Sequence, residues 1–255
     1  MEVHNIMNKK KVYFLGDIHG VFKPIKKLYN QGLIEKDSVL VLLGDAGLNY
    51  FLDEKDTDVK KKLSELPLTY FIVRGNHEER PSLLMQRHPH DWKLIKFFGN
   101  ATYVEKEFPN IHYALDSVAE YNINGHNTLI IPGAYSIDKF YRLKRGWRWF
   151  PQEMLTQKEM DEGLKILKPH YDLILSHTCA IEDEPTHLFI SGVDQTFVNK
   201  EMEHYISKVK KQITYDVHLW GHYHKTEFHE GKPLKVMLYN DQAVELEILF
   251  KERWF

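Results

Sequence analysis

Five short apolar runs recur along the chain, and each is followed directly by polar residues. The runs cover residues 11–15, 39–43, 69–73, 171–175 and 217–220. Apolar runs of this length are typical of buried strands, and strands that are apolar throughout are typical of parallel sheets covered on both faces. We therefore predict parallel strands that each end in polar side chains.

Four further segments carry helical signals. Gly32 closes the first of them and Pro67 stops the second, as glycine and proline commonly do at helix ends. In the third segment, Thr156 stands at the N-cap and Glu159 at the capping-box position. We expect helices over residues 22–31, 56–66, 156–167 and 197–212. Strands that alternate with helices in this way predict an α/β fold.

The remaining segments have shorter or less regular patterns. Residues 111–115 and 128–131 are predicted to be antiparallel strands, and Asn124-Gly125-His126 predicts a hairpin turn. The end of the chain, residues 234–250, is predicted to form two antiparallel strands around Asn240-Asp241. Two segments without a clear period, residues 134–149 and 183–192, are predicted to be long loops.

Composition limits the classes of protein that fit. The 255 residues suit one large α/β domain, so a single domain over residues 1–255 is expected, and a hydrophobic share of 43% allows an extensive core. The formal net charge of −2 makes nucleic acid an unexpected partner and gives no reason for a membrane anchor. The apolar runs are too short to span a bilayer. The polar residues 1–11 and the single cysteine, Cys179, favour a cytoplasmic location.

The polar residues behind the five apolar runs are of the types that bind divalent metal ions. They lie in the segments Gly16-Asp17-Ile18-His19-Gly20, Gly44-Asp45-Ala46-Gly47, Arg74-Gly75-Asn76-His77-Glu78, Ser176-His177-Thr178 and Gly221-His222-Tyr223-His224. Residues two apart on an extended backbone point to the same side, so Asp17 with His19, and His222 with His224, can each address one site. The carboxyl ends of strands are also the usual place for chemistry in open α/β sheets.

In this order the five motifs resemble the calcineurin-like metallophosphoesterase superfamily, over residues 11–224. The string Arg74-Gly75-Asn76-His77-Glu78 is similar to its phosphoprotein phosphatase branch, and residues 135–149 resemble a segment of bacterial and phage-type members. The resemblance implies a four-layer α/β/β/α sandwich of two mixed sheets with flanking helices, the metallo-dependent phosphatase fold. It also implies a metal-dependent phosphoric ester hydrolase.

The resemblance further implies which residues hold two divalent metal ions. The ligands of the first ion would be Asp17, His19 and His224, and those of the second Asn76, His177 and His222. Asp45 would bridge the two ions. Manganese is the expected metal, with iron or zinc as alternatives. Two such ions, about 3.5–4 Å apart, make hydroxide from bound water and neutralise the phosphoryl oxygens.

Other residues are candidates for proton transfer and substrate binding. His77 follows the ligand Asn76 directly and is expected to protonate the departing ester oxygen, since histidine exchanges protons near neutral pH. Arg74 and Arg80 flank it and are candidates for phosphate binding, because a planar guanidinium matches two phosphate oxygens. A salt bridge with a neighbouring glutamate is the alternative explanation for Arg74.

The sequence departs from the phosphatase branch at one place. That branch normally has an Asp and an Arg three and four residues beyond the bridging Asp, which orient the acid histidine and bind phosphate. Leu48 and Asn49 occupy these positions here. Residues 135–149, which include Arg142 and Arg145, are the candidate replacement. The alternative is a surface loop whose tryptophans simply pack.

The expected activity is hydrolysis of phosphate monoesters, in a phosphoprotein or a small phosphorylated metabolite, by attack of a metal-bound hydroxide. The alternative is a phosphodiesterase that acts on a cyclic nucleotide, a dinucleotide or a nucleic acid, since the same kind of metal centre serves both reactions. A metal-binding scaffold without catalysis is a third hypothesis, which the intact ligand set and His77 disfavour.

Overall fold

The computed structural model describes residues 10–189 and 194–251 and contains two mixed β-sheets. The first sheet has the strand order β13-β1-β2-β3-β6-β5-β4, and the second has the order β11-β12-β10-β9-β8-β7. The strands of the first sheet are β1 (Val12–Leu15), β2 (Val39–Leu43), β3 (Thr69–Val73), β4 (Trp92–Phe97), β5 (Asn100–Glu105), β6 (Ile111–Tyr113) and β13 (Val244–Glu245). Those of the second are β7 (Ala119–Ile123), β8 (His126–Ile131), β9 (His170–Ser176), β10 (Thr214–Trp220), β11 (Glu227–His229) and β12 (Leu234–Met237).

The central strands of each sheet are parallel, and antiparallel strands lie at the margins. In the first sheet β1, β2, β3 and β6 run parallel, and in the second β8, β9, β10 and β12 do. The parallel strands include all five apolar runs predicted from the sequence. Their carboxyl ends therefore meet at one edge of each sheet.

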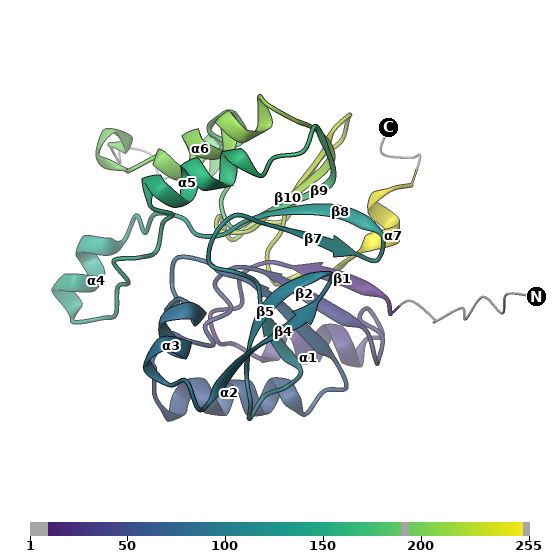
Figure 1. The fold of residues 1–255 in the computed structure, drawn as a ribbon, viewed down its shortest axis with the longest axis vertical. Helices are drawn as coiled ribbons and strands as arrows, with labels where there is room; N and C mark the ends of the chain where they lie inside the picture. Colours follow the sequence, from purple (N-terminus) through teal and green to yellow (C-terminus); the bar gives the residue numbers. More distant parts are fainter. Residues whose placement is uncertain (1–9, 190–193, 252–255) are drawn as a thin grey trace, which may run out of the picture.

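Helices cover the outer face of each sheet (Figure 1). The helices are α1 (Lys23–Asn30), α2 (Glu54–Ser64), α3 (Pro81–Arg87), α4 (Lys139–Arg145), α5 (Gln157–Lys165), α6 (Glu201–Lys210) and α7 (Leu246–Leu249). Of these, α1, α2 and α3 lie on the outer face of the first sheet, and α5 and α6 lie on that of the second. Alternate strand residues face opposite ways, so Leu15 and Leu42 pack with Ile25 of α1 and Leu63 of α2. On the other sheet, Leu129 and Ile174 pack with Met160 of α5 and Ile206 of α6.

A third apolar layer lies between the two sheets. It includes Phe14, Val41 and Phe71 from the first sheet and Leu173 and Leu219 from the second. The order is thus helix, sheet, sheet, helix, which confirms the predicted four-layer sandwich. None of the helices within the described residues is long and apolar enough to cross a membrane.

Several local predictions were correct. The predicted helices correspond to α1, α2, α5 and α6, and Thr156 and Glu159 form the expected capping box. Asn124 and Gly125 have φ angles of 54° and 101°, as a tight hairpin between β7 and β8 requires. Short 3-10 turns at Ile181–Asp183 and Thr186–Leu188 interrupt the second predicted loop, whose end at residues 190–192 lies outside the described residues.

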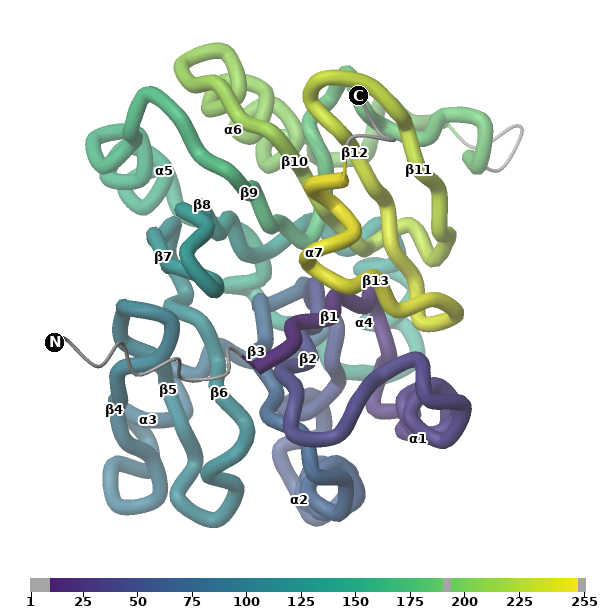
Figure 2. Tube along the Cα trace, turned by 90° about the vertical axis from the view of Figure 1, so that its right-hand side faces the viewer, coloured from purple at the N-terminus to yellow at the C-terminus, as the bar shows by residue number. Residues whose placement is uncertain are grey.

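Other local predictions were wrong because periodicity does not identify pairing partners. β6 and β8 each pair with one parallel and one antiparallel neighbour, so they are not purely antiparallel strands. The strands of the tail do not pair with each other: β12 joins the second sheet, whereas β13 pairs with β1 (Figure 2). Residues 134–149 contain α4, which projects from the body of the molecule (Figure 1).

Candidate metal centre

The predicted ligands follow the carboxyl ends of parallel strands from both sheets. Asp17 and His19 follow β1, Asp45 follows β2, and Asn76 follows β3. The second sheet contributes His177 behind β9, and His222 and His224 behind β10. Asp17 and His222 meet directly across the two sheets, since the His222 backbone N–H donates to Asp17 Oδ1 over 2.8 Å.

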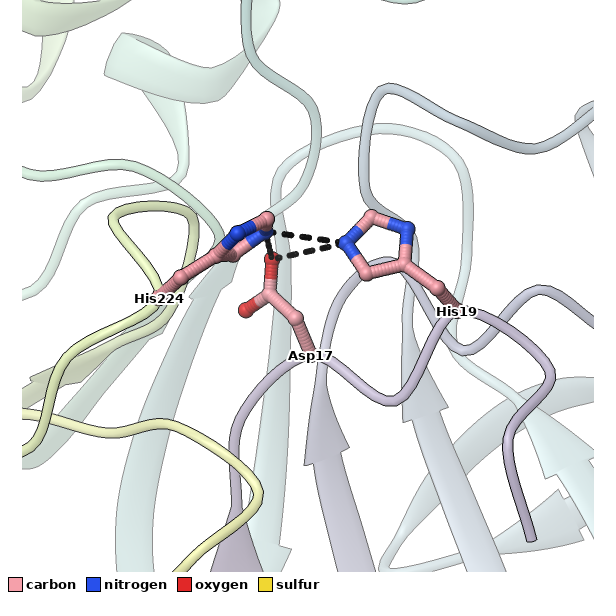
Figure 3. Close-up of side chains that lie close together, drawn as sticks. All are labelled: Asp17, His19 and His224. Carbon is pink, nitrogen blue, oxygen red and sulfur yellow. Dashed lines mark hydrogen bonds and ion pairs between the residues drawn. The ribbon is translucent and has the colours of Figure 1, made fainter.

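Asp17, His19 and His224 form the first ligand group (Figure 3). The Nε2 atoms of the two histidines lie 2.9 Å apart, and Asp17 Oδ2 lies 3.5 Å from His224 Nε2 and 3.9 Å from His19 Nε2. Asp17 is buried, whereas the histidine side chains are 31% and 50% exposed. Three donor atoms thus converge on one point that is open to solvent on one side.

This first group fits a divalent cation. Within residues 10–189 and 194–251, no hydrogen bond reaches the buried Asp17 Oδ2 atom, although a buried carboxylate oxygen is costly to leave unpaired. The facing Nε2 atoms of His19 and His224 cannot both donate to each other. A metal ion bound by all three residues would satisfy the carboxylate oxygen and both nitrogen lone pairs.

Asn76 and His177 form a second group. His177 Nε2 lies 2.8 Å from Asn76 Oδ1, and the other ring nitrogen, Nδ1, lies 2.8 Å from the Leu43 carbonyl oxygen. Burial would lower the pKa of His177, but the carboxylates of Asp45 and Asp17 raise it to about 9, so both ring nitrogens carry protons in the metal-free protein. Because the Leu43 carbonyl accepts the Nδ1 proton, Nε2 is the nitrogen that would lose its proton on binding a metal ion. The His222 ring lies 4.9 Å from the His177 ring, centre to centre, and burial lowers the pKa of His222 to about 3. A neutral imidazole is the form that binds metal.

Asp45 lies between the two groups. Its Oδ2 atom is 3.8 Å from His19 Nε2, and its Oδ1 atom is 3.5 Å from His177 Nε2. Burial alone would raise the pKa of Asp45, but the charges of His177, His77 and His19 hold it well below its usual value. The carboxylate is therefore ionised and faces both groups.

Backbone strain concentrates at the same residues. His19, Asp45, His222 and His224 have φ angles of 45°, 45°, 71° and 54°, in the left-handed region that non-glycine residues seldom adopt. Such conformations persist where the surrounding structure imposes them, and they cluster at functional sites. Gly75 is also required, because a Cβ atom there would lie 2.1 Å from Asp45 Oδ1.

His77 contacts two residues of the 134–149 segment. Arg142 Nη2 lies 2.9 Å from His77 Nδ1, and His77 Nε2 lies 3.6 Å from Asp138 Oδ1. Asp138 also accepts a hydrogen bond from Arg142 Nε over 2.7 Å. Burial would raise the pKa of Asp138, but hydrogen bonds from His77 and Arg142 outweigh it and lower the pKa to about 2. An ionised carboxylate and a guanidinium therefore flank the imidazole.

Asp138, Ser136 and Glu153 also lie near the predicted ligands, although the sequence did not identify them as site residues. Asn76 Nδ2 donates to Ser136 Oγ over 2.8 Å, and Ser136 Oγ donates to Glu153 over 2.5 Å. This chain fixes the amide so that its oxygen faces His177. The four-residue spacing of Asp138 and Arg142 was a usable signal for an ion pair on a helix.

Three of the arginines predicted to bind phosphate make other contacts. Leu48 and Asn49, the positions at which the sequence differs from the phosphatase branch, lie in the protein interior. Arg74 is buried and donates to the Glu153 carbonyl, and Arg80 holds Glu159 and two backbone carbonyls. Arg145 is exposed on α4, over the ring of Tyr141. These contacts argue against phosphate binding by the three arginines. Leu48 and Asn49 are both buried, and Leu48 packs in the core beneath the first sheet.

A cavity of about 400 Å³ opens over the ligands. Its floor includes Asp45, Asn76, His222 and His224. The lining also includes Tyr135, Ile137 and Asp138 from one segment, and from a second segment Leu188, Phe189, Gln195, Val198, Asn199, Lys200 and Glu203. The cavity thus joins the metal ligands to two segments that lie far apart in the sequence.

The sequence profile described as calcineurin-like phosphoesterase matches residues 10–226, so the chain belongs to this family and is a phosphoric ester hydrolase. The family depends on a dinuclear metal centre. No curated protein matches the sequence.

Among the solved structures that resemble this chain, the one with a TM-score above 0.5 supports the fold. One covers 94% of this chain and 96% of its own, at 14% identity and a TM-score of 0.53. TT1561 of Thermus thermophilus covers 91% and 90%, at 14% identity and a TM-score of 0.48. A phosphopantetheinyl hydrolase of Mycobacterium tuberculosis covers 96% and 94%, at 12% identity and a TM-score of 0.49. At such identities the likeness concerns the fold alone.

Proposed function

We propose that this protein hydrolyses phosphate monoesters, in a phosphoprotein or a small phosphorylated metabolite, with two divalent ions held by the seven predicted ligands. The position of Asp45 carries the proposal, since its two oxygens lie 3.8 Å from His19 Nε2 and 3.5 Å from His177 Nε2. One carboxylate that reaches both ligand groups suits a dinuclear centre.

The residues around the ligands suit proton transfer to the leaving group. When bound, two divalent ions would activate water and neutralise phosphoryl charge. His77 Nε2 lies beside Asp138, and His77 Nδ1 lies 2.9 Å from Arg142 Nη2 and 3.4 Å from Asp45 Oδ2. As an imidazolium, His77 would give its Nε2 proton to the departing ester oxygen and keep its Nδ1 proton, while Asp138 holds the ring. The Arg142 guanidinium would bind phosphoryl oxygens.

Three further points belong to this proposal. Manganese suits the mixed set of carboxylate, amide and imidazole donors, although imidazole also suits zinc and iron. The single cysteine supports a cytoplasmic location. The apolar layer shared by both sheets supports a single domain.

A parallel assay tests the proposal. Metal-free protein is loaded with manganese, and its rates on p-nitrophenyl phosphate and bis(p-nitrophenyl) phosphate are compared, with chelated protein as the control. We expect metal-dependent hydrolysis that is faster on the monoester. Faster hydrolysis of the diester would make the protein a phosphodiesterase. Two bound ions without turnover of either ester would make it a scaffold.

A further inference from the structure

One part of the cavity lining is more apolar than the part that contains the predicted metal ligands. Leu188, Phe189 and Val198 give it an apolar and aromatic surface, and Glu203 of α6 is its acidic residue. The Phe189 ring is inclined by 22° to that of Tyr223, which also lines the cavity. This surface has no ligand for the metal ions, so it faces the part of a substrate that lies beyond the phosphate.

Glu203 has an unpaired carboxylate oxygen. The residue is 3% exposed, and its Oε1 atom accepts a hydrogen bond from Thr178 Oγ1 over 2.7 Å. Its Oε2 atom is buried and has no hydrogen-bond partner in the part of the chain that the structure describes. Burial also raises the pKa of this carboxyl group. A buried polar atom without a partner is uncommon in native proteins and calls for an explanation.

The other contacts near Glu203 do not supply a partner for Oε2. Lys200 Nζ is held by Glu184 Oε1 at 2.5 Å and lies over the Phe189 ring. The residues of α6 that face the second sheet, such as Met202 and Ile206, are apolar. Thr178 thus accounts for Oε1 of Glu203, but no described residue accounts for Oε2.

We propose that Glu203 and the Phe189 ring form a leaving-group subsite for a small phosphate ester that combines a planar ring with an O–H or N–H donor, as a nucleoside monophosphate does. The donor would supply the partner that Oε2 lacks, and the planar ring would lie against the aromatic wall. The cavity of about 400 Å³ is in the range of small-molecule sites. This inference rests on the proposed monoesterase function and narrows its substrate class.

The test compares Glu203→Leu with the wild type on four esters of three kinds. AMP and GMP have both a ring and donors, p-nitrophenyl phosphate has a ring without a donor, and β-glycerophosphate has donors without a ring. We expect kcat/KM of Glu203→Leu to fall at least tenfold on the nucleotides and to stay within twofold on p-nitrophenyl phosphate. His204→Leu, an exposed neighbour on α6, is the matched control.

Metal content and thermal stability are measured on each variant. A similar loss of kcat/KM on all esters would mean that Glu203 only supports the fold. Unchanged turnover of the nucleotides by Glu203→Leu would also overturn the inference. So would a wild-type protein that hydrolyses a phosphopeptide faster than either nucleotide. These outcomes leave the proposed function intact as long as the wild type hydrolyses p-nitrophenyl phosphate. Failure on every monoester would instead refute the proposed function itself.

Discussion

Arg142 Nη2 lies 2.9 Å from His77 Nδ1, although 65 residues separate them in the sequence. The contact ties the helix that projects from the molecule to the residue that follows the ligand Asn76. Asp138 completes the group, since it lies 3.6 Å from His77 Nε2 and accepts a hydrogen bond from Arg142. A carboxylate and a guanidinium thus stand beside His77 even though Leu48 and Asn49 replace the usual pair.

Arg142→Gln should lower kcat/KM by about 10- to 100-fold, since a hydrogen bond to a charged group contributes roughly 1.5–3 kcal/mol. Most of the loss should be in KM, because the guanidinium would bind phosphate in the ground state as well as in the transition state. Arg145→Gln, on the same helix but exposed, should behave like the wild type. Steady-state kinetics on p-nitrophenyl phosphate check both variants. Equal losses in the two would place the effect in α4 as a whole.

Asp45→Asn should reduce activity more than Asn76→Ala does. Asp45 faces both predicted ligand groups, so loss of its charge would weaken both metal sites, whereas Asn76 would be a neutral ligand of one. Turnover and metal content of the two variants should be compared. Equal and mild losses would remove Asp45 from the bridging role.

Binding of divalent metal ions should raise the melting temperature of the protein. Without these ions, the buried Asp17 Oδ2 atom accepts no hydrogen bond from the described residues, and the Nε2 atoms of His19 and His224 face each other at 2.9 Å. Ions that bind the native state alone stabilise it by about 2.7 kcal/mol per site at a free concentration of 100 Kd. For a chain of this size that corresponds to about 5–10 °C in Tm. Calorimetry with manganese and with chelator measures the shift, and Asp17→Ala should reduce it. Identical melting curves would contradict a metal centre.

Acid should destabilise the fold through His112. Burial, with the charges of Lys10 and Lys93, lowers the pKa of His112 to about 4, and its ring stacks on Phe97. The unfolded state binds a proton below about pH 6.5 that the native state refuses until about pH 4, so stability falls as the pH falls through this window.

At pH 5 the loss due to His112 should be about 2 kcal/mol, since about 1.5 pH units separate pH 5 from the unfolded pKa. His112→Phe, which keeps the stacking, should therefore lose less stability than the wild type between pH 7 and pH 5. Urea unfolding of metal-free protein measures this without a contribution from metal release. His88→Phe, at an exposed position, is the control and should follow the wild type. Parallel pH curves for all three would show that His112 does not titrate in this way.

The features predicted correctly from the sequence are those that depend only on residues close together in the chain. Apolar runs that end in Asp17, Asp45 or His222 predicted both the buried strands and the edge at which the ligands meet, because strand burial and strand ends are local properties. The role of Asp138 was not predictable in this way. It depends on a contact with His77 across the fold, and the segment that carries it has an exposed helix with exposed apolar residues such as Phe140 and Leu143, which obscure any period.

Strand pairing in the tail was not predictable for a related reason. Periodicity indicates that Val244 lies in a strand, but β13 pairs with β1 at the other end of the chain. The same limit applies to the arginines. Arg74 and Arg80 flank His77 in the sequence, yet their guanidinium groups bind the Glu153 carbonyl and the Glu159 carboxylate, which the sequence gives no means to place beside them.

The last prediction concerns His77. If it donates a proton and holds no metal, His77→Ala should keep both ions and lose about 10²- to 10⁴-fold in rate, the usual scale for general acid catalysis. The loss should depend on the leaving group, because an alkoxide needs a proton to depart whereas nitrophenolate leaves without one. The variant should therefore retain more activity on p-nitrophenyl phosphate than on an alkyl phosphate.

Asp138→Asn tests how much the orientation of the His77 ring contributes to the rate, apart from proton transfer by the ring itself. The substitution removes the charge that faces Nε2 but leaves the imidazole in place, so its loss should be smaller than that of His77→Ala and should show the same dependence on leaving group. Metal content and rates on both esters are measured for the two variants. Loss of metal in His77→Ala would make His77 a ligand, and an equal fall on both esters would exclude it as the acid. Because Asp138 contacts His77 and Arg142 but none of the metal ligands described above, metal loss in Asp138→Asn would instead show that the 134–149 segment supports the whole centre.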